Sequence, residues 1–186
     1  DVMGPVINNL VTNRYGLEGA IDYYLKNEYY AVLEGGAGRS EVNYTDLKYT
    51  TNNFFVRAGF NKNILTRESN HDWDMMFAGL RAGFASVNRS EADYVVADSL
   101  WGINEGISAA RSFPALWLEL NLGMRVELYK GIMAGWNVRS KFIMNGKSFR
   151  DLQPLYISGF GRGDKNAVFD FNLYLSYAIR WNRVGK

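Results

Sequence analysis

The chain has 186 residues, a formal net charge of +2 and no cysteine. This length fits one domain, the small charge lacks the basic excess of a nucleic-acid-binding protein, and the missing cysteine excludes disulfides and thiol chemistry. No run of about 18 apolar residues is present, which excludes a transmembrane helix but not a membrane-spanning β-barrel, whose strands are apolar on one face only. Aromatic residues make up 15% of the chain and only three residues are proline, which favours strands over helices.

Seven segments alternate between apolar and polar residues, as strands with two different faces do. Residues 1–13 come first as a turn or short helical connection, and we interpret Asp1–Met3 as the end of an earlier strand. Tight turns are expected at 26–28 and 129–131, and loops at 38–52, about 62–72, 87–113 and 145–166. The predicted strands are 15–25, 29–37, 53–61, 73–86, 115–128, 132–144 and 167–181.

The strand over 115–128 is the clearest of the seven. Every second residue from Leu116 to Leu128 is apolar, while Glu119 and Arg125 belong to the opposite face. A helix would spread these leucines around its whole circumference. The segment is long enough to cross a bilayer as a tilted strand, which takes about 9–11 residues.

Short and long connections alternate along the chain, which is typical of an up-and-down antiparallel barrel. A closed antiparallel barrel with both termini on the same side needs an even number of strands. The sequence therefore predicts an all-β, eight-stranded transmembrane β-barrel in a single domain, residues 1–186, whose first strand lies largely upstream of Asp1. No signal peptide is seen at Asp1, as expected of a mature or trimmed product.

The placement of charge indicates which face is inside. The apolar faces carry no charge in mid-strand, as a lipid face requires, because a charge at the bilayer midplane costs about 2–4 kcal/mol. Aromatic residues such as Tyr15, Tyr29 and Trp73 gather near strand ends, as in interfacial girdles. The polar faces hold both signs of charge, which predicts a narrow lumen filled by paired side chains. The expected lumen residues are Glu18, Asp22, Glu34, Arg57, Arg81, Glu119, Arg125, Glu127, Arg139, Lys141, Asp170 and Arg180.

No constellation indicates catalysis, a cofactor or a metal. His71 is the only histidine and lies beside Asp72 and Asp74, where an exposed turn residue is the simpler interpretation. Gly35–Ser40 lacks the Gly-Lys-Ser/Thr ending of a phosphate loop, and Arg162-Gly163-Asp164 matches an integrin-binding tripeptide that is too short to be specific. We therefore expect no enzyme.

The predicted loop 87–113 is unusually apolar for an outward loop. Exposed apolar clusters mark partner surfaces, although the loop could equally fold down and cap its own barrel. The candidate contact residues are Tyr94, Val95, Val96, Leu100, Trp101 and Ile103.

Three motifs resemble a family of small outer-membrane barrels of Bacteroidota, a domain of unknown function. They are Gly79–Phe84, Leu155–Gly161 and the strand Phe169–Tyr177. In the second motif Ser158 stands where that family usually has proline. The family pattern begins with a strand containing Gly-Val-Asp, whose end Asp1-Val2 would match. The resemblance implies an outer-membrane location in a Gram-negative bacterium, no catalytic residues and a role in a complex.

We therefore expect a non-enzymatic accessory or structural subunit of an outer-membrane complex, such as the Omp85-type barrel-assembly machinery, which inserts proteins into the outer membrane. The expected partners are outer-membrane lipid and other outer-membrane proteins or lipoproteins, with no nucleic acid. The alternatives are a surface binding or adhesion barrel, a narrow pore, a lipid-modifying enzyme and a soluble lipocalin-like carrier.

Overall fold

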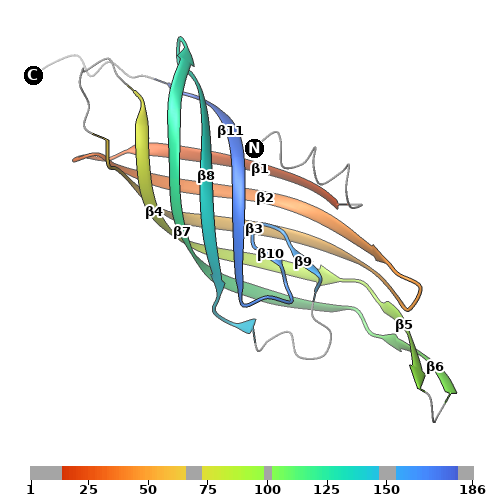
Figure 1. The fold of residues 1–186 in the computed structure, drawn as a ribbon. Helices are drawn as coiled ribbons and strands as arrows, with labels where there is room; N and C mark the ends of the chain where they lie inside the picture. Colours follow the sequence, from red (N-terminus) through yellow and green to blue (C-terminus); the bar gives the residue numbers. More distant parts are fainter. Residues whose placement is uncertain (1–13, 66–72, 99–101, 147–153, 180–186) are drawn as a thin grey trace, which may run out of the picture.

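The structure is a computed structural model that describes residues 14–65, 73–98, 102–146 and 154–179, with the backbone alone described for 14, 96–98 and 102–103. The described residues form an all-β, antiparallel fold (Figure 1). Its strands are β1 (Arg14–Tyr24), β2 (Tyr29–Asn43), β3 (Leu47–Asn63), β4 (Met75–Arg89), β5 (Ala92–Asp98), β6 (Gly102–Ser108), β7 (Arg111–Tyr129), β8 (Ile132–Ile143), β9 (Tyr156–Ile157), β10 (Gly161–Arg162) and β11 (Ala167–Tyr177).

Seven long strands pair in the order β1-β2-β3-β4-β7-β8-β11, which is the meander predicted from the alternation. The remaining pairs are extensions of this sheet or additions to it. β5 and β6 form a hairpin that continues from β4 and β7, and β5 pairs with the start of β3 through Leu47 and Tyr94. In Figure 1 this hairpin projects past the ends of the other strands.

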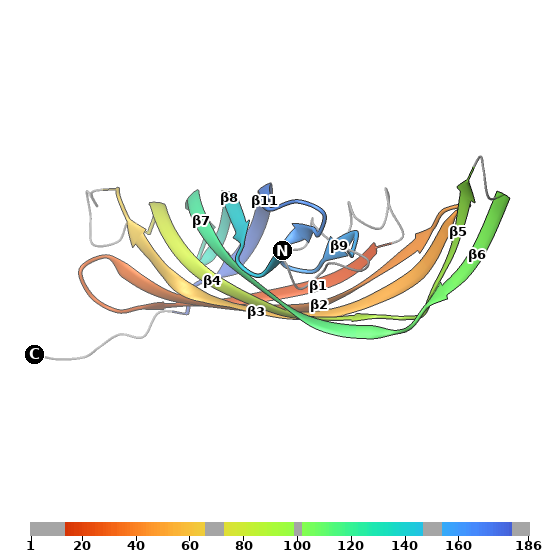
Figure 2. The same ribbon diagram turned by 90° about the horizontal axis from the view of Figure 1, so that it is seen from below.

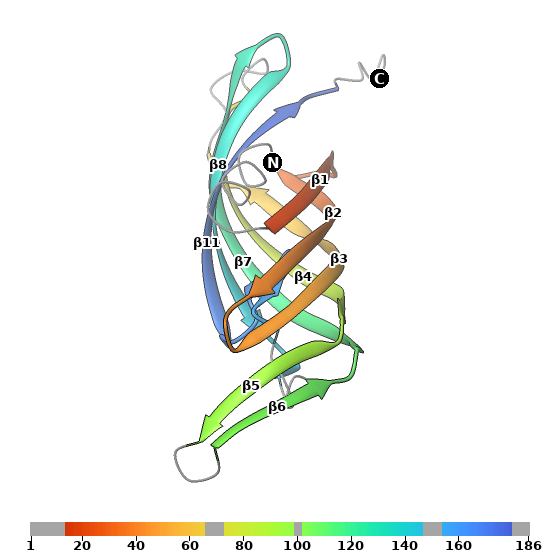
Figure 3. The same ribbon diagram turned by 90° about the vertical axis from the view of Figure 1, so that its right-hand side faces the viewer.

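The sheet is strongly curled, so that it has a concave and a convex face (Figures 2 and 3). Strict alternation assigns each residue to one face, because neighbours in register point to the same side. One convex row crosses all seven long strands and is apolar throughout. It consists of Ile21, Leu33, Ala58, Ala82, Leu118, Phe142 and Ala167.

The described sheet is a curled half-barrel and not the closed eight-stranded barrel that the sequence predicts. Within the described residues β1 pairs only with β2 and β11 pairs only with β8. The physical reason is strand direction: in a meander of seven antiparallel strands the first and the last run the same way, so β1 and β11 cannot close the sheet by antiparallel pairing. Asp1–Met3, which we interpreted as the end of another strand, lies outside the described residues.

The prediction of a loop over 38–52 is wrong. β2 continues to Asn43 and β3 already begins at Leu47, so that only 44–46 connect them. Both faces carry polar residues here, which hides the alternation, but Val42 and Tyr49 are buried and still mark the concave face.

The other two long predicted loops are also largely structured. Residues 87–113 contain the end of β4, the β5–β6 hairpin and the start of β7, so the apolar cluster expected in a loop lies on a hairpin. Residues 145–166 contain β9 and β10, and Figure 2 shows β9 inside the curve of the sheet.

The two tight turns are confirmed. Asn27 and Glu28 have φ of 54° and 65°, and Lys130 and Gly131 have φ of 41° and 92°. These left-handed backbone conformations suit the twist of a tight β-hairpin.

Candidate functional site

Glycines on the concave face make room for large side chains from neighbouring strands. Gly59 of β3 lies opposite Arg81 of β4, and a Cβ at Gly59 would overlap Arg81. Gly83 of β4 lies opposite Trp117 of β7, where a Cβ would enter the indole ring. The absence of a side chain at these two glycines therefore leaves room on the concave face for the base of the Arg81 side chain and for the Trp117 ring.

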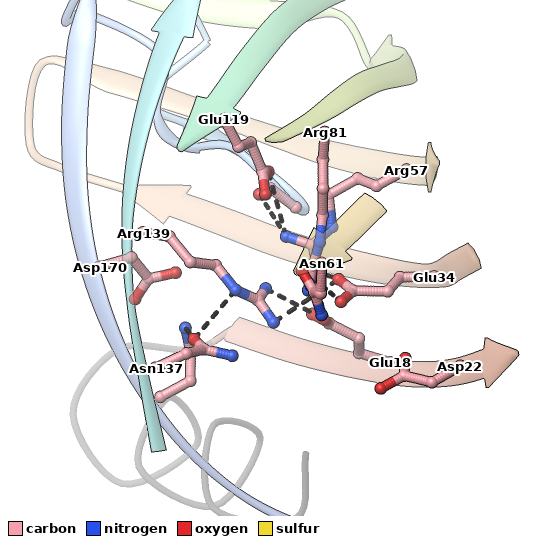
Figure 4. Close-up of polar contacts among 12 residues, drawn as sticks. Glu18, Asp22, Glu34, Arg57, Asn61, Arg81, Glu119, Asn137, Arg139 and Asp170 are labelled. Carbon is pink, nitrogen blue, oxygen red and sulfur yellow. Dashed lines mark hydrogen bonds and ion pairs between the residues drawn. The ribbon is translucent and has the colours of Figure 1, made fainter. Parts of the chain in front are cut away.

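Arg57 is the centre of the concave charge cluster (Figure 4). Its guanidinium forms ion pairs with Glu18 of β1, with Glu34 of β2 at 2.6 Å and with Glu119 of β7 at 3.3 Å. Arg57, Glu34 and Glu119 are all buried. Three carboxylates from three strands thus surround one cation.

Two further arginines complete the cluster. Arg81 pairs with Glu34, and the Arg139 guanidinium lies 3.3 Å from Glu18 and 3.5 Å from Glu34. Arg139 is on β8 and Glu18 is on β1, with four long strands between them in the sheet. Their ion pair therefore crosses the concavity, as Figure 4 shows, and holds the sheet in its curl.

The side chains around this cluster are paired in the same way. The Trp117 indole nitrogen donates to Glu119 at 2.6 Å, and Lys141 lies 2.8 Å from Asp170 of β11. Farther along the sheet, Arg125 lies 3.0 Å from Asp22. Acids and bases balance along the concavity, so it attracts neither sign of ion strongly.

The segment that contains β9 and β10 folds onto the cluster. The Gly159 carbonyl accepts hydrogen bonds from Arg57 at 3.1 Å and from Lys141 at 2.7 Å. Ile157 and Phe160 are fully buried, and the Phe160 ring lies 5.8 Å from the ring of Trp117. This segment closes one end of the concavity with an apolar layer over the ion pairs.

Two glycines permit this inward fold. Gly159 and Gly161 have φ of 81° and 119°, a region that L side chains rarely adopt. A Cβ at Gly159 would also overlap the Phe55 ring. Leu155–Gly161, the motif that carries part of the family resemblance, is therefore an inward plug.

The structure brings most of the predicted lumen residues together on the concave face. The main cluster contains Glu18, Glu34, Arg57, Arg81, Glu119, Arg139, Lys141 and Asp170. Asp22 and Arg125 form a separate pair. Glu127 instead accepts from the Gly131 backbone nitrogen at 2.7 Å, beside the β7–β8 turn, and Arg180 lies outside the described residues.

The plug is what the sequence prediction missed. The spacing of Ile157, Phe160 and the two glycines was a signal for it, since two bulky apolar residues in a polar loop need a buried place. Asn53 was also missed. Its amide donates to the Tyr156 carbonyl at 3.2 Å and to the Ser158 hydroxyl at 3.4 Å, which ties the plug to β3.

The predicted partner surface is described only in part. Tyr94 is exposed and packs over Gly106, and Val95 is half-buried. Val96 and Ile103 belong to the paired strands of the hairpin. Leu100 and Trp101 lie outside the described residues.

The remaining candidates are described only in part. His71 lies outside the described residues. Within the described ranges, no group of three or more His, Cys, Asp or Glu side chains is placed to hold a metal ion. In the same part of the chain no helix has the length and hydropathy to cross a membrane. Arg162 and Asp164 form an exposed pair at 2.7 Å, and hydrogen bonding to Arg162 lowers the pKa of the Asp164 carboxyl.

Together these features describe one kind of protein: a curled antiparallel sheet with a charge-paired inner face and an apolar outer face. The model of the family described as "Domain of unknown function (DUF6048)" matches residues 1–183, and the chain belongs to this family. No curated protein and no solved structure matches the chain.

Proposed function

We propose that the protein is an integral outer-membrane β-barrel of eight strands that acts as a non-enzymatic structural subunit of a membrane complex. The observation that carries this proposal is the convex face. It exposes large apolar side chains from all seven long strands, with Leu17 at 77% and Phe169 at 75% exposure. Soluble monomers rarely expose apolar patches larger than a few hundred Å², so a lipid environment accounts for this face better than water does.

The height of the apolar belt supports the same environment. On β2 the convex face is free of charge from Tyr29 to Ala37, and Arg39 is the first charge beyond it. On β3 the corresponding stretch lies between Asn52 and Lys62. These lengths agree with the roughly 9–11 residues that a tilted strand needs to cross a bilayer.

The outer edges of β1 and β11, which are unpaired within the described residues, support closure by one more strand. β1 and β11 are the first and last of seven consecutive antiparallel strands, so they run in the same direction. A single strand between them would be antiparallel to both and would satisfy both edges. Unpaired backbone groups are costly in hydrocarbon, which makes an open edge untenable in a membrane.

The filled concavity favours a structural role over transport. The ion pairs of Arg57 with Glu34 and Glu119 are buried and the plug folds over them, so a water-filled path through the barrel is not expected. The alternative of a narrow pore predicts discrete current steps in single-channel recordings from planar bilayers. Our proposal predicts none at the potentials where porins conduct.

The β5–β6 hairpin supports the subunit role, because it extends past the other strands. Among the described residues β6 pairs only with β5, so its outer edge offers a strand with which a partner could pair. The partners we propose are outer-membrane proteins or lipoproteins, with the barrel-assembly machinery as the first candidate. A surface-adhesion function would use the same hairpin toward an external ligand.

Gentle detergent extraction from native membranes, followed by identification of co-purifying proteins, tests the proposal. We expect the protein in the membrane fraction, in stoichiometric complex with an Omp85-type barrel or with lipoproteins. Deletion of residues 92–108 should release the partners and leave the barrel in the membrane. Recovery in buffer without detergent would contradict the membrane assignment, and a barrel that always purifies alone would contradict the subunit role.

A further inference from the structure

A groove of about 580 Å³ lies on the convex side of β1, β2 and β3, near the end from which the β5–β6 hairpin projects. Its position is unusual because it straddles the edge of the apolar belt. One end of the groove is polar and the other is apolar. The convex-face residues that line it are Tyr15, Leu17, Ala37, Arg39, Asn52, Phe54 and Asn88.

The polar end is a row of side chains in cross-strand register. Arg39 of β2 lies opposite Asn52 of β3, which lies opposite Asn88 of β4. Neighbours in such a row have Cα atoms about 4.5–5.5 Å apart. The Ser112 hydroxyl donates to Asn88 Oδ1 at 2.6 Å, which leaves the Asn88 amide nitrogen as a donor. The row thus offers one guanidinium and two amides.

The apolar end is one cross-strand row of convex side chains, next to the polar row. Leu17 and Phe54 are both well exposed and form its walls. Ala37 of β2 lies between them in cross-strand register, and its small side chain leaves the hollow. A ligand with a charged head and an apolar tail matches this order of surfaces.

The charge of the polar end indicates an anion. Arg39 is exposed, and no carboxylate of the described residues lies within ion-pairing distance of it. Glu41, the next acid on this face of β2, lies farther from the belt and does not line the groove. Guanidinium groups recognise phosphate through charge-assisted hydrogen bonds in a matching planar geometry.

We propose that this groove binds a phosphorylated lipid of the outward leaflet. Arg39 pairs with the phosphate, Asn52 and Asn88 donate to phosphate or ester oxygens, and Leu17 and Phe54 hold one acyl chain. The inference rests on the proposed membrane function. The leaflet follows from the connections: the two tight turns with left-handed backbone lie at the opposite end of the strands, whereas the β5–β6 hairpin and the connection with β9 and β10 lie at the groove's end. In outer-membrane barrels the short turns are periplasmic and the longer connections face outward.

Native mass spectrometry of the full-length protein in detergent tests this site. The probes are dimyristoyl phosphatidic acid, dimyristoyl phosphatidylcholine with the same chains, and inorganic phosphate alone. The wild-type protein should retain phosphatidic acid in preference to phosphatidylcholine and should not retain inorganic phosphate. Arg39→Gln should weaken retention of phosphatidic acid about tenfold, as expected for a lost charge-assisted contact.

Lys48→Gln is the matched control, because Lys48 is an exposed cation on the same face of β3 beyond the groove. It removes the same charge and should leave retention unchanged. Equal binding by the wild-type protein and Arg39→Gln, an equal loss in both variants, or retention of inorganic phosphate alone would overturn the proposal. Insertion of the wild-type protein into lipid vesicles is scored separately, so that failure of the membrane assignment is distinguished from failure of the lipid site.

Discussion

The two faces of the sheet place opposite kinds of residue in opposite surroundings. The concave face buries Arg57, Glu34 and Glu119, whereas the convex face exposes Leu118, Leu120 and Leu122. A water-soluble barrel has the reverse arrangement, with apolar residues inside and charge outside. If lipid surrounds the convex face, as we propose, the surrounding medium and not the β-fold itself decides which face is apolar. A substitution on the concave face should destabilise the protein when it breaks a buried ion pair, and one on the convex face when it places a charge against lipid. The expected loss of stability is largest for the buried ion pairs and smallest for an exposed pair.

The largest effect is expected at the centre of the concave cluster. Arg57→Ala removes the cation that pairs with Glu18, Glu34 and Glu119, so that the three carboxylates lose their shared partner. Breaking a buried ion pair by removing one partner costs about 3–5 kcal/mol. The free energy of unfolding, measured by urea titration in lipid vesicles, should fall by this amount. Lys48→Ala, which removes an exposed cation, is the control and should change it little; an equally small loss for Arg57→Ala would contradict the account of the cluster.

The next effect concerns the convex face. Leu120 lies near the middle of β7 and is 54% exposed. If the convex face contacts lipid, Leu120→Arg places a charge near the bilayer midplane and destabilises the protein by about 2–4 kcal/mol. The same titration in vesicles measures it. Ser112→Arg, on the same face of the same strand but beyond the belt, is the control with a small expected change. An equally small effect at Leu120 would favour a face in water.

A moderate effect is expected in the plug. Gly159→Ala adds a Cβ at φ +81° against the Phe55 ring. Backbone strain of this kind costs about 1–3 kcal/mol. The plug should loosen before the sheet does, so backbone amides of 155–163 should exchange hydrogen faster than those of β7. Gly146→Ala is a suitable control, because a Cβ there meets only ordinary contacts. Unchanged exchange in Gly159→Ala would show that the plug does not depend on this glycine.

The smallest effect is expected at the exposed Arg162–Asp164 pair. Because the folded state lowers the pKa of Asp164, the pair stabilises the fold above the ordinary carboxyl pKa and loses this contribution as pH falls through the lowered value. Solvent screens exposed pairs strongly. Asp164→Asn should therefore leave the thermal midpoint at neutral pH unchanged within error, and a clear drop would show that the pair has a structural role.

Much of the fold could be predicted from the sequence because alternation reports directly on a strand with two different environments. The segment 115–128 is the clearest case, and the seven long strands and their order follow from the same signal. The extensions of β2 and β3 could not be predicted in this way. In Arg39–Asn43 both faces of the strand carry polar residues, so the sequence has no strong periodicity although the strand continues.

The residues of the concave cluster could be predicted from the sequence, but the contacts between them could not. Parity alone places Glu34, Arg57 and Glu119 on one face. It cannot show that Arg57 holds three carboxylates or that Glu127 turns to the β7–β8 connection instead. The plug was missed because two-residue strands such as β9 leave no period to detect, and its position depends on contacts with β3 that are distant in sequence.

The central claim is that the convex face contacts lipid, and spin-label accessibility along β7 tests it most directly. The chain has no cysteine, so the single substitutions Leu116→Cys, Leu120→Cys and Met124→Cys can each carry one label in vesicles. Our account predicts that oxygen, which partitions into lipid, relaxes these labels more than a water-soluble nickel chelate does, with the largest difference at Leu120. Preferential relaxation by the nickel chelate at Leu120 would contradict it.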